Sequence, residues 1–241
     1  MTRAGCLMRL ELAGESLELD PSGLLVWPRR ALVAVADLHL EKGSAYARRG
    51  RFLPPYDTHA TLARLEAALD RLRPAVVVSL GDGFHDRRGP ERLEPDLAER
   101  LRRLTGGVDW LWVRGNHDPE PPVGLGGRPV PELRLDGLVL CHEPTGGGGR
   151  VVGEVAGHLH PKARVAARRL GVVRRPCFAS DGGRLLLPAF GSFTGGLDVL
   201  DPAIAGLFPA GFAAYLLGEE RVFRLPHDRL LPDPWPAALA R

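Results

Sequence analysis

Residues 31–39 read ALVAVADLH, a run of six apolar residues followed by an aspartate and, two positions later, a histidine. A short apolar run of this kind is typical of a strand that is covered on both faces, as in a parallel sheet. In α/β folds the carboxyl ends of such strands carry the ligand site. The stretch therefore predicts a buried strand over residues 31–36 that delivers Asp37 and His39 to a functional site.

The same arrangement recurs four more times along the chain. Further strands are predicted by the apolar runs over residues 75–80, 108–113, 138–141 and 151–156. Polar side chains or imidazoles follow these runs in order, namely Asp82, Asn116-His117-Asp118, His142, and His158 with His160. Together with His39, the histidines of these clusters make up five of the eight in the chain. The recurrence predicts that one edge of the fold gathers carboxylates, an amide and imidazoles.

Two longer segments show apolar residues at helical spacing. Leucines recur every three or four positions within residues 57–73, and residues 95–104 form a second such segment that ends before two glycines. Later apolar runs over 184–187 and 221–225 indicate a second sheet. We therefore predict an α/β (α+β) fold, a two-sheet mixed β-sandwich flanked by helices. We expect a single domain over residues 1–241, mainly β in its second half, with an irregular tail over residues 226–241.

Composition excludes several classes of protein. The 241 residues are 44% hydrophobic and 25% charged, which is ordinary globular usage and argues against a disordered chain or a coiled coil. No apolar stretch is long enough to span a membrane, and the first residues lack a signal-peptide pattern. We expect a cytoplasmic protein with no membrane partner. The three cysteines form no CxxC pair, which argues against a disulfide framework and a zinc finger.

The residue types at the strand ends are those that bind divalent transition metals. Carboxylate, amide and imidazole groups suit Mn, Fe or Zn. Asp37 and His39 are two positions apart, as are His158 and His160, so strand alternation would place each pair on one face. One such pair is usually ordinary polar surface or core. Five clusters in order, with glycines where the backbone must approach a ligand, predict a metal centre.

The order of these motifs resembles the calcineurin-like metallophosphoesterase superfamily. The matching pattern is DLH at 37–39, GD at 81–82, GNHD at 115–118, His142, and GHLH at 157–160. The local sequence over residues 36–199 is more similar still to that of the bacterial ligase-associated DNA damage response endonucleases. It includes ADLHLEKGSAYARRG from Ala36, GDGFHDRRGP from Gly81 and PAFGSFTGGLDV from Pro188. This resemblance implies the calcineurin-like metallophosphoesterase fold.

The resemblance also implies the roles of individual residues. Two divalent cations are expected, with Mn favoured and Zn or Fe as alternatives. One would be held by Asp37, His39, Asp82 and His160, and the other by Asp82, Asn116, His142 and His158, so that Asp82 bridges. His117 follows a ligand and is the candidate to protonate the leaving oxygen. Asp118 is the candidate to orient His117. His85, Arg87 and Arg88 follow Asp82 closely and are candidate substrate-binding residues, with a solvated polar loop as the alternative.

The function implied is that of a metal-dependent phosphodiesterase, a hydrolase acting on ester bonds. The favoured hypothesis is a DNA endonuclease in DNA repair that acts on single-stranded or flexible DNA, using a hydroxide activated by two metals. A DNA ligase and a helicase are implied as functional associates. The alternative is a small-molecule phosphoesterase acting on nucleotides or cyclic nucleotides. A non-catalytic metal-binding scaffold is disfavoured, because His117 and every expected ligand are present.

Two further features leave alternatives open. Residues 162–184 contain seven basic side chains and one acid, Asp181. Such a run is either an electrostatic track for a nucleic-acid backbone or a solvated face in a chain with 30 arginines and 2 lysines. Cys141 precedes His142 and could be a nucleophile beside a base. If the two side chains alternate across a strand, Cys141 faces the core instead.

Overall fold

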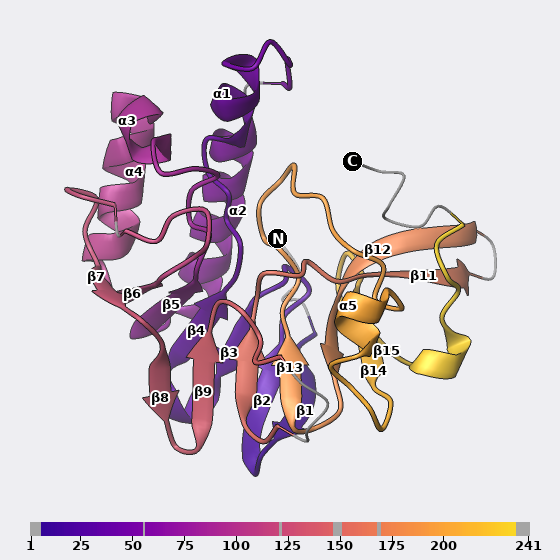
Figure 1. The fold of residues 1–241 in the computed structure, drawn as a ribbon. Coiled ribbons are helices and arrows are strands. Elements are labelled where there is room, and N and C mark those ends of the chain that lie inside the picture. The colour runs from indigo at the N-terminus through magenta and orange to yellow at the C-terminus, as the bar shows by residue number, and fades with distance from the viewer. Residues whose placement is uncertain (1–5, 55, 121, 147–150, 168–169, 235–241) are drawn as a thin grey trace.

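The computed structural model describes residues 6–54, 56–120, 122–146, 151–167 and 170–234. Within these residues two β-sheets pack face to face, with helices on their outer faces (Figure 1). This layering confirms the predicted two-sheet mixed β-sandwich flanked by helices. No helix in the described part of the chain is both long enough and apolar enough to cross a membrane.

The first sheet contains strands β1 to β7 in chain order. Their bounds are β1 Met8–Leu12, β2 Glu15–Leu19, β3 Leu25–Trp27, β4 Leu32–Val35, β5 Val76–Leu80, β6 Asp109–Val113 and β7 Arg128–Val130. Strands β1 to β4 pair antiparallel, whereas β4 to β7 pair parallel. Helical crossovers join β4 to β5 and β5 to β6, so the carboxyl ends of these strands lie at the same edge of the sheet.

The antiparallel start of this sheet is absent from the sequence prediction. Strands β1 and β2 alternate buried leucines with exposed polar residues, so neither forms a continuous apolar run. The turn between them is Ala13-Gly14, and both residues have positive φ, at 52° and 86°. Two such residues form the tight turn whose twist matches that of antiparallel strands. This hairpin extends the sheet away from the site.

Helices cover the outer face of the first sheet. The helices of this half are α1 Lys42–Ala47, α2 Asp57–Leu72, α3 Gly89–Arg92 and α4 Pro95–Gly106, and a 3₁₀ turn covers Pro28–Arg30. Leu62 and Leu65 of α2 and Leu101 of α4 are fully buried against β4, β5 and β6. The helices predicted over 57–73 and 95–104 are therefore confirmed to within two residues at either end.

The second sheet runs in the order β15-β14-β12-β13-β10-β9-β8, with β11 paired to β12 outside this path. Its strands are β8 Leu133–Leu135, β9 Leu138–Cys141, β10 Glu154–Ala156, β11 Lys162–Ala167, β12 Gly171–Ser180, β13 Arg184–Leu186, β14 Ala213–Leu217 and β15 Val222–Pro226. Strands β9, β10 and β13 are parallel neighbours. The short helix α5, Pro202–Ala205, packs on the outer face. The mainly β second half is confirmed for the described residues.

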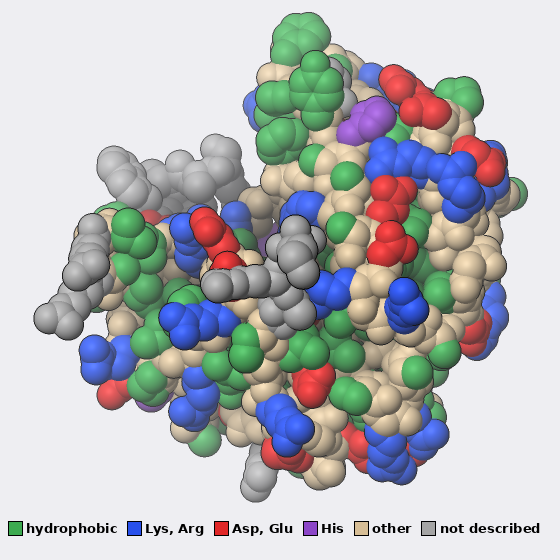
Figure 2. All heavy atoms as spheres, turned by 180° about the vertical axis from the view of Figure 1, so that it is seen from behind, with side chains coloured by type: hydrophobic (Ala, Val, Ile, Leu, Met, Phe, Trp, Pro, Cys, Tyr) green, Lys and Arg blue, Asp and Glu red, His purple; other side chains and the backbone are tan. Residues whose placement is uncertain are grey.

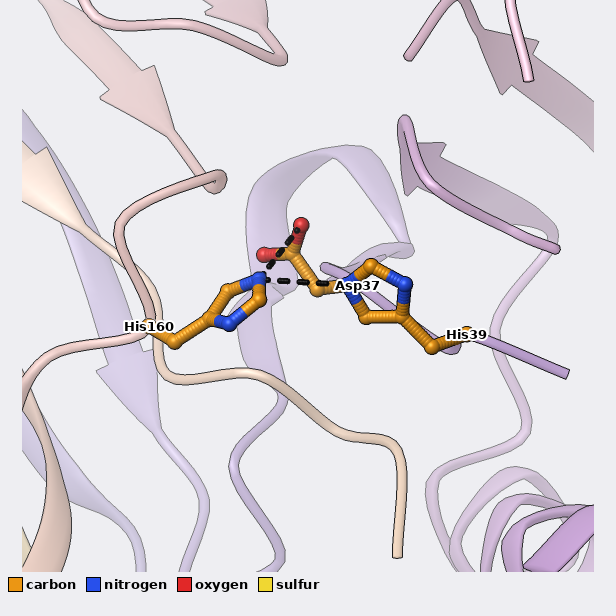
Figure 3. A group of neighbouring side chains, drawn as sticks. All are labelled: Asp37, His39 and His160. Atoms are coloured by element: carbon orange, nitrogen blue, oxygen red, sulfur yellow. Dashed lines mark hydrogen bonds and ion pairs between the residues drawn. The ribbon is translucent and has the colours of Figure 1, made fainter. Parts of the chain in front are cut away.

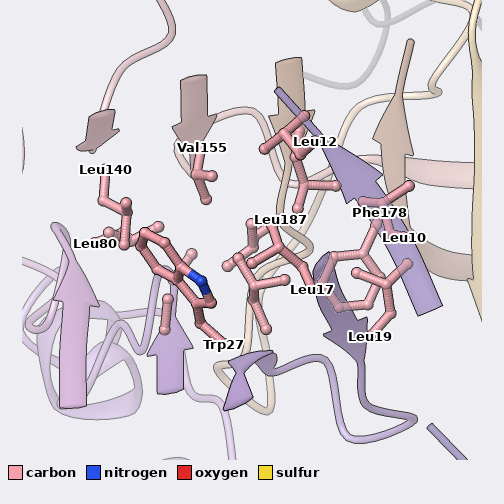
Figure 4. Close-up of a cluster of buried hydrophobic side chains, with 14 of the residues drawn as sticks. Leu10, Leu12, Leu17, Leu19, Trp27, Leu80, Leu140, Val155, Phe178 and Leu187 are labelled. Carbon is pink, nitrogen blue, oxygen red and sulfur yellow. The ribbon is translucent and has the colours of Figure 1, made fainter. Parts of the chain in front are cut away.

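The core lies between the two sheets. Figure 4 shows leucines of β1 and β2 packed with Trp27 and Leu80 of the first sheet and with Leu140, Val155 and Phe178 of the second. These side chains are almost fully buried. Burying a large apolar side chain contributes about 1.5–3 kcal/mol to stability, so this layer holds the two sheets together.

The tail predicted over residues 226–241 is only partly irregular. Strand β15 extends to Pro226, and a 3₁₀ turn covers His227–Arg229. Leu231 donates its backbone N–H to the carbonyl of Arg164, so this segment is attached to β11. Residues 235–241 of the predicted tail lie outside the described residues.

Candidate metal centre

The predicted site residues all leave their strands at one edge of the sandwich. The loops after β4, β5, β6, β9 and β10 carry Asp37, Asp82, Asn116, His142 and His158. These loops bond to one another through their backbones. His39 donates its N–H to the carbonyl of Asp82 at 2.9 Å, and Gly157 donates to the carbonyl of His142 at 3.0 Å. The edge is therefore built by loops that hold each other in place.

The backbone of this edge is strained. Five of the predicted ligands have positive φ between 42° and 69°: Asp37, His39, Asp82, His158 and His160. Residues with side chains occupy this left-handed region rarely, at a cost of about 1–3 kcal/mol each, and they cluster at functional sites. The expectation that strand alternation brings these pairs together is wrong, because both members of each pair lie in left-handed turns beyond the strand.

A first group contains Asp37, His39 and His160, with donor atoms within 4.8 Å of one another. Figure 3 shows the three side chains pointing toward a common centre. The Nε2 atoms of His39 and His160 are 3.2 Å apart, and His160 Nε2 is 3.3 Å from Asp37 Oδ1. The other carboxylate oxygen of Asp37 accepts the backbone N–H of His158 at 3.0 Å, which orients it.

A second group contains Asp82, His142 and His158, and Asn116 joins it. His142 Nε2 lies 3.2 Å from His158 Nδ1, 2.8 Å from Asn116 Oδ1 and 3.5 Å from Asp82 Oδ1. His142 Nδ1 lies 2.9 Å from the Leu80 carbonyl. A carbonyl can only accept, so Nδ1 carries the proton and Nε2 presents its lone pair to the centre.

Asp82 lies between the two groups. Its Oδ1 atom is 3.5 Å from His142 Nε2, and its Oδ2 atom is 3.8 Å from His39 Nε2. Oδ1 also accepts the backbone N–H of His117 at 2.9 Å. One carboxylate thus faces nitrogen donors of both groups, which is the position a bridging ligand requires.

Three glycines make this close approach possible. A Cβ atom at Gly115 would lie 2.2 Å from Asp82, one at Gly81 would lie 2.4 Å from the His142 ring, and one at Gly157 would lie 2.7 Å from Asp37. Each contact is below the distance that real Cβ atoms show. The glycines beside the strand ends are therefore required by packing against these side chains.

The donor set fits divalent cations. Burial, with the neighbouring His160 and His117 adding to it, lowers the pKa of His39 to about 2, and burial also lowers the pKa of His158. These rings are therefore neutral and turn nitrogen lone pairs toward two buried carboxylates. Asp37 Oδ1 is buried and accepts no hydrogen bond from the described residues. A buried cluster of acceptor atoms without matching donors is costly unless a bound cation is coordinated by them.

The ring of His117 projects over the centre and is half-exposed, with its Nε2 atom 4.0 Å from Asp82 Oδ2. The His117 Nδ1 atom lies 2.9 Å from the carbonyl of His85, so Nδ1 donates and Nε2 faces the centre. The His85 ring stacks on the His117 ring, with centroids 5.4 Å apart.

The interpretation that Asp118 orients His117 needs correction. Asp118 accepts the backbone N–H of Phe84 at 2.9 Å, and within the described residues the His85 carbonyl makes the contact to the His117 ring. Burial, together with the Asp82 carboxylate, raises the pKa of Asp118 to about 7. The side chain has turned inward because the loop that carries Asp82, Gly83 and Phe84 offers it unpaired backbone donors. Asp118 joins two site loops.

The start of α2 anchors the loop after the first motif. The Thr58 hydroxyl accepts the backbone N–H of Glu41 at 2.9 Å and donates to its carboxylate at 3.0 Å. Asp57 accepts the N–H of Gly43 at 3.0 Å. These contacts place Lys42 at the rim of the centre, where burial lowers its pKa and its amino group lies 5.7 Å from the ring of Tyr46.

Two of the three predicted substrate residues line a cavity of about 640 Å³ beside the centre. Arg87 and Arg88 belong to it, together with Asn116 and His117. His85 lies deeper, where burial lowers its pKa to about 4. The cavity also contains Arg48 and Arg49, which the sequence analysis did not single out. The available signal was their position directly after the first motif, in the run AYARRG.

A model of the calcineurin-like phosphoesterase family matches residues 31–188, the span that contains every residue of the two groups. The chain belongs to the calcineurin-like phosphoesterase family. Membership implies a hydrolase acting on phosphoester bonds. Members of this family typically depend on two metal ions, and the two groups above are the candidate sites.

Two solved structures give a further comparison. The nuclease MPE from Pseudomonas putida is 32% identical, with a TM-score of 0.69, and the match covers 91% of this chain and 100% of that one. The phosphoesterase Yfce from E. coli is 17% identical with a TM-score of 0.39, over 81% of this chain and 98% of that one. A search of curated proteins gives no match.

Proposed function

We propose that this chain is a metal-dependent DNA endonuclease that cuts single-stranded or flexible DNA in DNA repair. Family membership supports the phosphoester chemistry, and the likeness to a nuclease at 32% identity supports a nucleic-acid substrate. The single observation that carries the proposal is Asp82, whose two oxygens face nitrogen donors of both groups. Association with a DNA ligase and a helicase belongs to the same proposal and rests on the motif resemblance alone.

The ligand assignment follows the two groups. Asp37, His39 and His160 would hold one cation, Asn116, His142 and His158 the other, and Asp82 would contact both. When bound, two divalent cations neutralise phosphoryl oxygens and provide a nucleophile from water at neutral pH. We assign manganese as the preferred ion. The protein contributes rigid loops and neutral imidazoles, so the site needs little rearrangement to receive its ions.

His117 has the geometry of a general acid. Its Nδ1 proton is held by the His85 carbonyl, so Nε2, which faces the centre, is the ring atom that would bind and release a second proton. An imidazolium there can donate to the leaving oxygen as the P–O bond breaks. Asp118 acts in a different way, since it holds the Phe84 backbone and thereby keeps the loop of Asp82 beside His117.

A closed circle of single-stranded DNA tests this function, because only internal cleavage opens it. We expect opening with Mn²⁺ and none with chelator. Asp82→Ala is expected to reduce cleavage by about 10³-fold or more, since it removes a ligand of both cations. His117→Ala is expected to retain metal, measured by elemental analysis, and to lose about 10²–10⁴-fold in rate.

Bis-p-nitrophenyl phosphate and simple nucleotides are the matched substrates in this experiment. Hydrolysis of these small esters with the circle intact would overturn the endonuclease proposal and leave a small-molecule phosphoesterase. Metal binding without turnover of any of the substrates would indicate a non-catalytic scaffold instead.

A further inference from the structure

The cavity beside the metal centre is unusually rich in arginine. Its volume is about 640 Å³, within the range of about 300–1,000 Å³ that is typical of ligand sites. It begins at Asn116 and His117 and is lined on one side by the end of α1 and on the other by the segment before α3. The lining includes Arg48, Arg49, Arg87, Arg88 and Arg92. Helices α1 and α3 contact each other at this end of the molecule (Figure 1).

The only acid that lines the cavity, among the described residues, is already neutralised. Arg92 binds both oxygens of Asp86, each at 2.9 Å, and its Nε atom donates to the Ser44 hydroxyl at 2.9 Å. The same carboxylate accepts the backbone N–H of Arg88 at 2.9 Å. The Arg92–Asp86 pair therefore forms a fixed, neutral part of the wall that ties α3 to α1.

The other four arginines keep their charges available. Arg48, Arg49, Arg87 and Arg88 are exposed, and in the described part of the chain none of their guanidinium groups has an acidic partner. The two pairs come from different segments and face one cavity. Four positive charges without counter-charges are more than one phosphate group requires.

Many arginines elsewhere on the molecule pair with acidic side chains. On the face seen in Figure 2, lysine and arginine side chains are spread widely and many lie next to acidic ones. Arg29 and Arg30, at the opposite end of β4 from Asp37, pair with Glu15 and Asp136. The cavity differs in that four arginines without an acidic partner among the described residues line one space beside the metal centre.

We propose that Arg48 and Arg49, directly after α1, together with Arg87 and Arg88, bind consecutive phosphates of one polynucleotide strand next to the phosphate that is cut. This inference rests on the proposed function and names the path by which the strand leaves the centre. Arginine suits the task, because its planar group binds phosphate oxygens through two hydrogen bonds at once. The cavity adjoins Asn116 and His117, so a strand bound there continues directly into the metal centre.

The test is binding of a fluorescent ten-residue oligothymidylate, measured by anisotropy in the Asp82→Ala background so that no cleavage occurs. The variant Arg48→Gln/Arg49→Gln is expected to bind at least about 10-fold more weakly at 0.15 M salt. Each lost phosphate contact reduces the slope of log K against log salt by about 0.7 for single strands, so the slope should fall by about 1.4. Arg29→Gln/Arg30→Gln removes the same charge from an adjacent pair and should change neither value.

Cleavage separates this inference from the proposed function. In the wild-type background, the double variant should lower the ratio of kcat/KM for DNA to that for bis-p-nitrophenyl phosphate by about 10-fold or more. Wild-type protein that binds the oligonucleotide through these arginines but does not cut DNA would overturn the endonuclease proposal and leave the strand path standing. Equal binding by the two arginine variants would overturn the strand path, as would an equal loss for oligothymidylate and thymidine monophosphate.

Discussion

Two basic regions adjoin the candidate metal centre, and they use their charges in opposite ways. The arginine cavity between α1 and α3 holds four guanidinium groups without acidic partners among the described residues. The β11–β12 ribbon and its continuation to β13 contain the basic run of residues 162–184, whose described members are mostly engaged with the protein itself. A count of basic residues favours the ribbon as the nucleic-acid-binding surface. The side-chain contacts of these residues favour the cavity as that surface.

The ribbon's basic side chains bind neighbouring segments. Lys162 donates to the Thr194 carbonyl at 3.1 Å, Arg164 donates to the Pro232 carbonyl, and Arg174 donates to the Gly196 carbonyl at 2.9 Å. Arg175 lines an apolar groove, away from the metal centre. Arg168 and Arg169 of the run lie outside the described residues. The alternative of an electrostatic track along this run is therefore not supported by the described contacts.

Arg184 shows the contrast most sharply. Its side chain is 1% exposed and its Nε atom donates to Glu154 at 2.5 Å. The remaining guanidinium nitrogens donate to the carbonyls of Thr145 and Leu207, at 2.6 and 3.0 Å. Every part of this guanidinium is satisfied inside the protein, so it cannot bind a nucleic acid. The lesson is that an arginine's partners, and not its place in a basic run, decide what it does.

The largest expected effect in the comparison of cavity and ribbon is the loss of stability when Arg184 is replaced. Arg184→Ala leaves Glu154 buried without its partner, which is expected to lower the free energy of unfolding by about 3–5 kcal/mol in urea. Arg174→Ala removes a half-exposed ion pair and should cost less than about 1 kcal/mol. Weakened DNA binding by Arg184→Ala with unchanged stability would break the comparison, because it would place this arginine among the DNA contacts.

Metal removal has the next largest effect, because each candidate group takes donors from both sheets. Asp37 and His39 follow β4, whereas His160 follows β10. An ion present at 100 times its Kd stabilises the folded state by about 2.7 kcal/mol, so chelation should lower Tm by about 5–11 °C. The measurement is a thermal scan with and without chelator. An Asp82→Ala protein should not respond, and a chelator-insensitive wild type would contradict a cation held between the sheets.

The ribbon itself should contribute little to DNA cleavage. Arg174→Gln/Arg175→Gln removes two charges, as Arg48→Gln/Arg49→Gln does, but from side chains that hold the chain's own segments or line the apolar groove. We expect kcat/KM for the DNA circle to change by less than about twofold, against the loss of about 10-fold or more expected at the cavity. A larger loss for the ribbon variant would reverse the comparison.

The smallest effect concerns Cys141, which, like the ribbon, lies near the centre without serving it. Burial raises the pKa of its thiol to about 12, and the Sγ atom faces the Glu143 carbonyl at 3.3 Å. A thiol with a raised pKa is almost fully protonated at pH 8 and reacts slowly. A disulfide reagent should therefore label the exposed Cys6 first, and Cys141→Ser should retain full activity. Activity lost in Cys141→Ser, with stability kept, would restore the nucleophile hypothesis.

Much of the fold and the site could be predicted from local sequence. The strands before Asp37, Asp82 and His142 are almost wholly apolar, and those before Asn116 and His158 are apolar after an initial Asp109 or Glu154, because buried parallel strands tolerate few polar residues. The hairpin of β1 and β2 escaped prediction, since its leucines alternate with charged residues. Strands β11, β12 and β14 were missed as well. Basic residues interrupt the apolar pattern of the β11–β12 hairpin, and β14 pairs with a segment of β12 that is distant in sequence.

Side-chain partners were beyond the reach of sequence. Asp118 follows His117 directly, yet its carboxylate binds the backbone of Phe84, 34 positions away. Likewise, the ligand pairs meet in left-handed turns and not by strand alternation, because the cost of a positive φ is offset only by contacts formed across the site.

The residue order alone predicted where the candidate metal centre lies in this protein. Each ligand type sits beside a strand that local apolarity predicts, and parallel strands must bring their carboxyl ends to one edge. Three-dimensional packing was needed to separate free charges from engaged ones. Arg184 meets Glu154, 30 positions away, whereas Arg48 and Arg87 meet no acid in the described structure. The strength of an ion pair depends on the distance between the two charges in space. Local sequence does not predict that distance for residues far apart in the chain.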